Sequence, residues 1–564
     1  MVQEEIPVLV VGGSLVGLSA SLFLARHGVD HLVVERHPGT AVHPRAAFLL
    51  QRTVEQFRAA GIQDEVVAAA EREFVQNGAI VSMESLAGRE LQWFYQNIND
   101  GVTHLSPVPR IFVTQIGLEP VLREAAAARG ARLRYGCEML SLTPDEDGVT
   151  AVLRDRAEGT ESTVRARYVV AADGVRSRVR QQLGIPMLGH GTFSDSITIY
   201  FRADVRKLLG ERNLSVVYVF GPRLQGFFRF AIDGRSGFLV VNSAVDDSGE
   251  KSTTVGATAT DEKCVAYVRE ALGDPDLPVE IENVQRWSAA AEWAERFRAG
   301  RVLIAGDAVH VMPPTGGYGG NTGVQDADNL AWKLAYVLDG RAGPELLDTY
   351  EAERLPVARF TTEQAYTRYV TRLDPSLGTD GLLPVVDDAI IDLGMRYRSA
   401  AVLAEEDGAP APAAGGEGVA WEDPNQPSGR PGFRAPHVGV WRDGREESTL
   451  DLVGTDPVLL VGVEGRSWLD AGRTAAERLG VGLERYRVGP GGDVTDRDGQ
   501  FATAYGIGKD GAVLIRPDGV IAWRARTAAA DLAAAVGAAL AAMLCRPGRG
   551  TVPAGGAVVL HEQT

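Results

Sequence analysis

A glycine-rich turn after the first apolar segment is the earliest place where this sequence could hold a cofactor. Residues 7–11 form a continuous apolar run, PVLVV, typical of a buried parallel strand, and the turn GGSLVG follows at 12–17. A helix rich in alanine and leucine and a second strand ending at Glu35 come next. This order predicts a βαβ dinucleotide site, in which backbone N–H groups and the helix N-terminus face a pyrophosphate while Glu35 accepts from a ribose hydroxyl.

Ser14 departs from this pattern, because it stands where the middle glycine of G-x-G-x-x-G is expected. A serine N–H can still contact a phosphate, but its Cβ narrows the approach. The alternative is a βαβ turn without a ligand, which would not need an acid at the end of the second strand. Because a carboxylate at Glu35 disfavours a 2′-phosphate, the cofactor expected here is FAD or NAD rather than NADP.

Two later segments could complete the same site. At 168–180, YVVAADGVRSRVR runs from an apolar strand into Asp173-Gly174 and a helix start. At 301–337, a strand ends at Gly306-Asp307, and a loop with two prolines and five glycines leads to a helix from about Asn321. The glycines allow close backbone approach, and the helix N-terminus offers N–H groups to an electron-rich or anionic ligand atom.

Taken in this order, the three motifs resemble those of the class A flavoprotein aromatic hydroxylases, which share the para-hydroxybenzoate hydroxylase fold. The resemblance is strongest over GDAVHVMPPTGGYGGNTGVQDADNLAWKLAYVLDGRAG and LLDTYEAER. Within that family the chain is most similar to the anthracyclinone and aromatic polyketide hydroxylases, on the tail segments GRPGFRAPHV, STLDL and YGIGKDGAVLIRPDGVIAWR. The resemblance covers nearly the whole chain and is weakest from 185 to 285.

The resemblance implies an α/β fold in which a Rossmann-like FAD-binding domain carries an inserted antiparallel-sheet substrate domain and a C-terminal thioredoxin-like domain. The expected boundaries are 1–185 and 286–401 for the FAD-binding domain, 186–285 for the substrate sheet, 402–435 for a linker rich in alanine, proline and glycine, and 436–564 for the tail. The tail has no C-x-x-C motif, so dithiol redox chemistry is not expected there.

The resemblance also assigns FAD contacts to residues in all three motifs. Those that would hold the pyrophosphate, ribose and ribityl parts are Gly12, Ser14, Leu15, Gly17, Glu35, Arg36, Arg45, Gln115, Asp173 and Asp307. Those that would line the isoalloxazine ring are Pro314, Gly317, Gly320 and Asn321. Arg45 and Asp173 would also serve NADPH; the alternatives are a solvated loop arginine at 45 and, at 173, a turn whose aspartate only ties the local backbone.

Two residues are candidates for catalysis. The segments between 190 and 285 alternate as strands, and Tyr218 falls where related hydroxylases place a tyrosine that faces the substrate. Arg372, in a long helix, matches an arginine beside the substrate hydroxyl, where a guanidinium would favour the electron-rich phenolate. A half-buried sheet tyrosine and a surface arginine are the alternatives for these two positions.

The function that the resemblance implies is an FAD-dependent monooxygenase that uses NADPH or NADH and O2. It would hydroxylate a phenolic, polycyclic, polyketide-type aromatic substrate through a flavin C4a-hydroperoxide. One alternative is a Baeyer–Villiger monooxygenase on the same scaffold, and another is a non-catalytic FAD-containing protein that sequesters its ligand. A flavin halogenase is disfavoured, since the sequence has no W-x-W-x-I-P stretch.

Charge and composition limit the partners. With 57 lysines and arginines against 74 acids, the formal net charge of −17 makes nucleic acid an improbable partner. No uninterrupted run of 18 apolar residues predicts a membrane span, and an acidic start is unlike a signal peptide, so the cytoplasm is expected. The three cysteines are scattered and the histidines show no ligand pattern, so no metal site is predicted. The sequence leaves open whether the protein forms a homo-oligomer.

Overall fold

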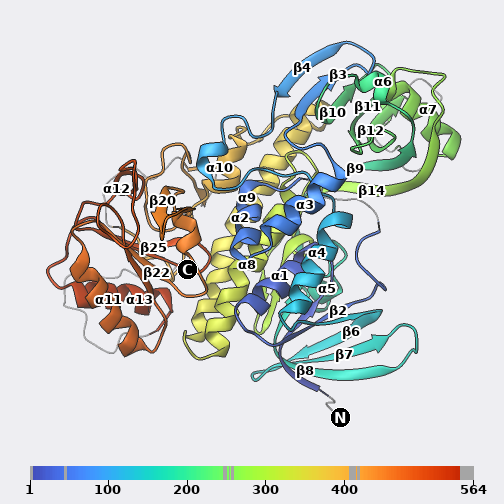
Figure 1. The fold of residues 1–564 in the computed structure, drawn as a ribbon. Helices are drawn as coiled ribbons and strands as arrows, with labels where there is room; N and C mark the ends of the chain where they lie inside the picture. Colours follow the sequence, from blue (N-terminus) through green and yellow to red (C-terminus); the bar gives the residue numbers. More distant parts are fainter. Residues whose placement is uncertain are drawn as a thin grey trace.

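The computed structural model describes residues 4–42, 48–245, 251–252, 255, 259–405, 414–415 and 419–546. They form three regions (Figure 1): a nucleotide-binding region with a largely parallel sheet, a large, mostly antiparallel sheet at one end, and a C-terminal unit on the other side. Helices α8 (Tyr318–Leu338) and α9 (Asp348–Arg372) run between these regions and contact all three.

The nucleotide-binding sheet has the order β15-β16-β8-β1-β2-β5, with β6 and β7 joined to β8 at one side. Its strands are β1 (Glu4–Val11), β2 (His31–Glu35), β5 (Arg132–Tyr135), β6 (Cys137–Pro144), β7 (Val149–Asp155), β8 (Glu161–Ala171), β15 (Arg298–Ala299) and β16 (Val302–Ile304). Central strand β1 is parallel to β2 and β8, and Val10 pairs with both Val33 and Val170. Helices α1 (Leu15–Arg26) and α4 (Gln115–Ala128) pack together, and α1 also packs on α8. The apolar run predicted to be a buried strand is therefore the centre of the sheet.

The second sheet has the order β17-β14-β9-β12-β11-β10-β3-β4, with β13 beside β12. Its strands are β3 (Ala79–Met83), β4 (Glu90–Tyr95), β9 (Met187–Arg202), β10 (Leu214–Phe220), β11 (Leu224–Phe230), β12 (Ser236–Val245), β13 (Lys251–Ser252), β14 (Glu280–Ala294) and β17 (His310–Val311). The sheet extends beyond the range 186–285, because β3 contributes Val81 and Met83 to the same core as Val217 and Val219 of β10.

The C-terminal unit has its own four-stranded sheet, in the order β23-β22-β24-β25. Its elements are β22 (Val458–Val461), α11 (Arg466–Leu479), β23 (Glu484–Arg487), β24 (Ala512–Ile515), β25 (Ile521–Ala525) and α13 (Leu532–Met543). Strands β22 and β23 are parallel and the other pairs antiparallel, while α11 packs against α13. The thioredoxin-like relationship of this unit stays a prediction.

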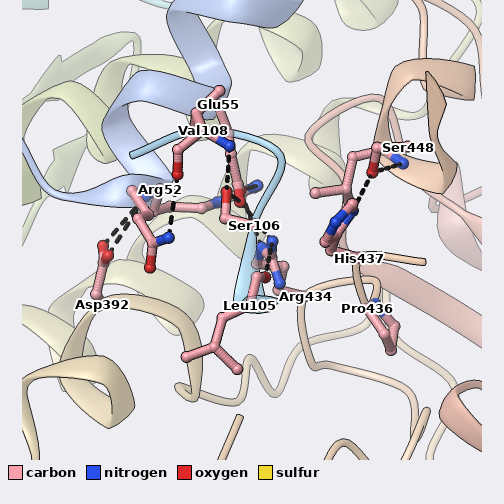
Figure 2. A network of polar contacts seen from close by, with 12 residues as sticks. Arg52, Glu55, Leu105, Ser106, Val108, Asp392, Arg434, Pro436, His437 and Ser448 are labelled. Carbon is pink, nitrogen blue, oxygen red and sulfur yellow. Dashed lines mark hydrogen bonds and ion pairs between the residues drawn. The ribbon is translucent and has the colours of Figure 1, made fainter. Parts of the chain in front are cut away.

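A polar network docks the chain before this unit onto helix α2 (Gln51–Ala59), as Figure 2 shows. Arg434 binds the Glu55 carboxylate through Nε at 2.9 Å and also through Nη2. Arg52 and Ser106 donate to the same carboxylate at 3.1 and 2.6 Å. The neighbouring Phe433 and Ala435 are buried, so this part of the expected linker is packed rather than extended.

Within the described part of the chain, no helix combines the length and apolarity needed to cross a bilayer. The same residues contain no group of three or more histidine, cysteine, aspartate or glutamate side chains arranged to hold a metal ion.

Candidate active site

The turn between β1 and α1 has the geometry that a pyrophosphate requires. Gly12 has φ of 108°, and a Cβ there would lie 2.2 Å from the carbonyl oxygen of Ala172. A Cβ on Gly17 would lie 1.9 Å from the carbonyl oxygen of Gly12, so only glycine lets α1 start this close to β1. The first turn of α1 contains no acid of its own, and the two carboxylates that reach this helix end come from other elements.

Ser14 fits this turn because its side chain points to a distant glutamate. The Ser14 hydroxyl donates to Oε1 of Glu119 at 2.5 Å, and the N–H of Leu15 donates to the same oxygen at 3.0 Å. The N–H of Ala41 donates to Oε2 at 2.6 Å, and burial raises the pKa of Glu119. Gln115, one turn earlier on α4, has its Nε2 3.5 Å from the Ser14 hydroxyl and so lies at the glycine turn, while its contact with FAD stays a prediction.

Glu35 lies beside the same turn, at the end of β2. Its Oε2 accepts from the N–H of Gly13 at 2.8 Å, and its Oε1 accepts from the N–H of His37 at 2.8 Å. Arg36 is exposed, and its Nε lies 3.3 Å from Nε2 of His37. Their contacts to an adenosine ribose stay predictions.

The acids of the second and third motifs differ in their surroundings. Asp173 accepts from the hydroxyl of Ser177 at 2.5 Å and from the N–H of Val179 at 3.1 Å. These local bonds are the ones expected if Asp173 only ties the backbone of its own turn. Asp307 is exposed between buried neighbours, at the end of β16. Arg45 lies outside the described residues, so its predicted role stays untested.

The loop before α8 has the backbone of a ligand cradle. Gly316 and Gly317 have φ of 93° and 70°, and Pro314 is exposed beside them. Gly320 is partly exposed in the first turn of α8. The Asn321 side chain is buried and donates to the carbonyl oxygens of Phe48 and Gly317 at 2.9 and 2.7 Å. Asn321 therefore fixes the loop with its side chain, and only its backbone remains to face a ring.

A buried cluster beneath this loop holds the third motif in place. Asp326 accepts from Nε of Arg354 and Nε2 of His310, each at 2.7 Å, and from the N–H of Gly306 at 3.0 Å. Although burial alone would raise it, the charges of Arg354 and His310 hold the pKa of Asp326 below its ordinary value. The carboxylate thus fixes Gly306, next to Asp307.

Tyr218 and Arg372 come together beneath the second sheet. Tyr218 is half-buried, and its ring lies 5.8 Å from that of Phe94 in an edge contact. The Arg372 guanidinium carbon lies 5.5 Å from the Phe94 ring centre. Burial raises the pKa of the Tyr218 hydroxyl, and the charge of Arg372 opposes that shift. The structure thus joins the two candidate catalytic residues, from β10 and α9, around Phe94.

A row of aromatic rings continues from this pair across the sheet. Phe227 lies 5.9 Å from Tyr218, Phe238 lies 6.4 Å from Phe227, and Tyr200 lies 6.1 Å from Phe238. These rings come from β10, β11, β12 and β9, so at about 4.8 Å per strand the row is roughly 14 Å long. The sequence analysis missed Phe94 and Glu119, because no local spacing marks them.

These features define a class of protein: one with a site for a dinucleotide-like cofactor and, beside it, a sheet that carries a row of aromatic side chains. The close approach of Gly12 and Gly17 and the backbone of the Gly316–Gly317 loop fit FAD. Comparison with known proteins agrees. Residues 5–365 match the family described as FAD binding domain, and residues 428–547 match the aromatic-ring hydroxylase C-terminal family. The chain therefore belongs to the FAD-dependent aromatic-ring hydroxylases.

Several relatives match along almost their full lengths. The chain is 49% identical to a 4-methyl-5-nitrocatechol 5-monooxygenase of Burkholderia sp, over 96% of this chain and 98% of that protein. It is 40% identical to an aklavinone 12-hydroxylase of Streptomyces purpurascens, over 94% and 98%. A crystal structure of aklavinone-11 hydroxylase with FAD and aklavinone superposes with a TM-score of 0.88, at 41% identity, covering 97% of this chain and all of that one. The protein is thus an FAD-dependent aromatic monooxygenase, and use of NADPH or NADH is typical of its family.

Proposed function

We propose that the protein hydroxylates a polycyclic phenol, with O2 as the source of the new oxygen and Arg372 beside the phenolic oxygen. The observation that carries this proposal is the meeting of Arg372, Phe94 and Tyr218. A guanidinium beside a phenol favours the phenolate, which places electron density on the ring carbons that an electrophilic oxygen attacks. The tyrosine hydroxyl can donate to the same phenolic oxygen.

The cofactor supplies an activated oxygen when it is reduced and exposed to O2, and the chain's own residues do the rest. Gly12, Gly17 and the α1 N-terminus would hold the pyrophosphate, and the backbone of Gly316 and Gly317 would line the ring system. The aromatic walls exclude water and align the substrate plane.

The length of the aromatic row favours a fused-ring substrate over a single ring. A row of roughly 14 Å suits a planar molecule of several rings, since ring faces and edges contact one another favourably. The names of relatives include both a nitrocatechol and polyketides, so the number of rings in the substrate has to be tested directly.

The test uses FAD-loaded protein, NADPH and air, with three sets of compounds: polycyclic phenols, their O-methyl ethers, and one-ring catechols. We expect polycyclic phenols to stimulate NADPH oxidation and to yield a product one oxygen heavier, whereas the ethers, which cannot form a phenolate, do not. Turnover of the catechols alone would contradict the polycyclic substrate. Equal turnover of phenols and ethers would contradict the role of Arg372.

A further inference from the structure

Asp388 gathers donors from three separate parts of the chain. It is the first residue of α10 (Asp388–Leu393), and its side chain is 21% exposed. Its Oδ2 accepts from the hydroxyl of Tyr95 at 3.0 Å, and its Oδ1 accepts from Nη2 of Arg368 at 2.8 Å and from the hydroxyl of Tyr318. These donors lie on β4, α9 and α8, so one carboxylate ties together three elements of the site.

Two of these donors sit next to residues already placed in the site. Tyr318 directly follows Gly317 of the cofactor-facing loop and begins α8. Arg368 precedes Arg372 by one helical turn on α9, and its guanidinium carbon lies 5.5 Å from the Tyr318 ring centre. Asp388 therefore fixes the start of α8 relative to the helix that carries Arg372.

The third donor holds a bulged strand. In the β3–β4 ladder, Ile80 pairs with Tyr95 and Val81 with Trp93, so Phe94 is an extra residue. Such a bulge re-aims a side chain, and here Phe94 contacts Tyr218 and Arg372. The bond from Tyr95 to Asp388 anchors the strand immediately beside the bulge.

The charges around Asp388 keep this arrangement intact at neutral pH. Burial alone would raise the pKa of Asp388, but the charge of Arg368, the Tyr318 hydroxyl, nearby Arg110 and the Tyr95 hydroxyl lower it. Burial and the carboxylate raise the pKa values of Tyr318 and Tyr95, so both remain donors. Asp387, which caps α10, is exposed.

We propose that Asp388 is a positioning residue for the hydroxylation, setting Phe94 and Arg372 relative to the cofactor-facing start of α8. This inference rests on the aromatic row around Phe94 and Tyr218 being the substrate site, as in the proposed function. Misplacement of reacting groups by about 1 Å can lower a rate about 100-fold, so loosening this link should separate cofactor reduction from oxygen transfer.

The test compares Asp388→Asn with Asp387→Asn in FAD-loaded enzyme. Asp387→Asn is the matched control, because asparagine caps a helix as well as aspartate does. In Asp388→Asn we expect kcat/KM for the phenol to fall about 10- to 100-fold and NADPH electrons to pass to hydrogen peroxide in place of product. The control should keep the wild-type ratio of product to NADPH, and FAD content and melting temperature verify that both variants are folded.

A second variant, Tyr95→Phe, keeps the ring and removes only the bond to Asp388. We expect it also to lower the product-to-NADPH ratio at normal FAD content, and it decides the matter alone if Asp388→Asn does not fold. Wild-type coupling in folded Tyr95→Phe and Asp388→Asn would overturn the inference. Absence of phenol-stimulated oxidation in the wild type would instead overturn the proposed function on which the inference rests.

Discussion

At the scale of single residues, the Arg372 guanidinium and the Tyr218 ring both lie beside Phe94. Arg372 lies over Phe94. Burial raises the pKa of the Tyr218 hydroxyl, and the positive charge of Arg372 acts to lower it. The tyrosine therefore stays protonated at neutral pH and can donate, while the arginine compensates a phenolate. Because Arg372 favours the phenolate form of the bound substrate, the pH dependence of turnover should change when this arginine is replaced.

We predict that Arg372→Met lowers kcat/KM at pH 7 about 10- to 100-fold and shifts its pH dependence upward by about 1–2 pH units. Without the guanidinium the bound phenol keeps a pKa nearer its value in water, so the phenolate forms only at higher pH. Profiles of kcat/KM from pH 6 to 10 measure this. Arg359→Gln, an exposed arginine on the same helix, is the control, and an unshifted profile in Arg372→Met would refute the assignment.

At the scale of elements, the approach of α1 to β1 decides whether the cofactor is held. Gly17 permits this approach because any Cβ would meet the Gly12 carbonyl at 1.9 Å. Position 14 tolerates a side chain because Ser14 turns to Glu119. Within the glycine motif, position 17 therefore admits only glycine, whereas position 14 admits a side chain.

We predict that Gly17→Ala purifies with little or no flavin, since α1 must move away from the turn. Ser14→Gly should retain flavin with affinity within about fivefold of wild type, because it loses one hydrogen bond of about 1 kcal/mol while Leu15 keeps its bond to Glu119. Absorbance ratios of flavin to protein report both. Stoichiometric flavin in folded Gly17→Ala would show that the close approach is not required.

The sequence was sufficient for the parts of the site that are local in the chain. The strand, turn, helix and acid of residues 7–35 and the loop at 313–321 follow from periodicity and glycine placement. Tyr218 and Arg372 were each singled out only through family resemblance, and their meeting at Phe94 is seen only in the structure. Ser14 with Glu119, and Tyr95 with Asp388, are 105 and 293 residues apart, so no spacing rule could join them. The Phe94 bulge depends on strand register, which composition does not determine.

At the scale of the whole molecule, buried charges link the C-terminal unit to the helices under the site. Arg516 binds both oxygens of Glu353 on α9, at 2.6 and 2.8 Å, and also Asp518. Lys333 of α8 donates to the same glutamate at 2.8 Å, and burial lowers its pKa to about 8. Because these groups are buried across the junction, the C-terminal unit and α8–α9 should unfold together.

We predict that Arg516→Met lowers the free energy of unfolding by about 3–5 kcal/mol, because it leaves the buried Glu353 and Asp518 carboxylates without their main cation. Flavin release and loss of secondary structure should still coincide in a thermal scan. Arg445→Gln, an exposed residue of the same unit, should change stability by less than about 0.5 kcal/mol. Two separate transitions in the wild type would contradict the linkage.

Asp392 of α10 adjoins the docking network, because its carboxylate accepts from the N–H of Arg52 at 3.3 Å, and its burial predicts a pH effect on stability. Burial raises the pKa of Asp392 to about 7, with the charge of Glu55 adding to the shift. Between about pH 4 and 7 the folded state then binds more protons than the unfolded state, so this group's contribution to stability falls as pH rises. Asp392→Asn, which mimics the neutral acid, should therefore be more stable than wild type at pH 8, by up to about 4 kcal/mol, with the gap closing toward pH 5. Denaturant midpoints at both pH values test this, with Asp387→Asn as control, and a gap independent of pH would count against it.

The central claim is that oxygen from O2 enters the aromatic ring of a phenol bound beside Arg372. Turnover of a polycyclic phenol by the FAD-loaded enzyme under ¹⁸O-labelled O2, followed by mass and NMR analysis, tests it directly. We expect one labelled oxygen as a new hydroxyl on an intact ring. Label in a ring-expanded ester, or NADPH consumed with ligand bound but without labelled product, would contradict it.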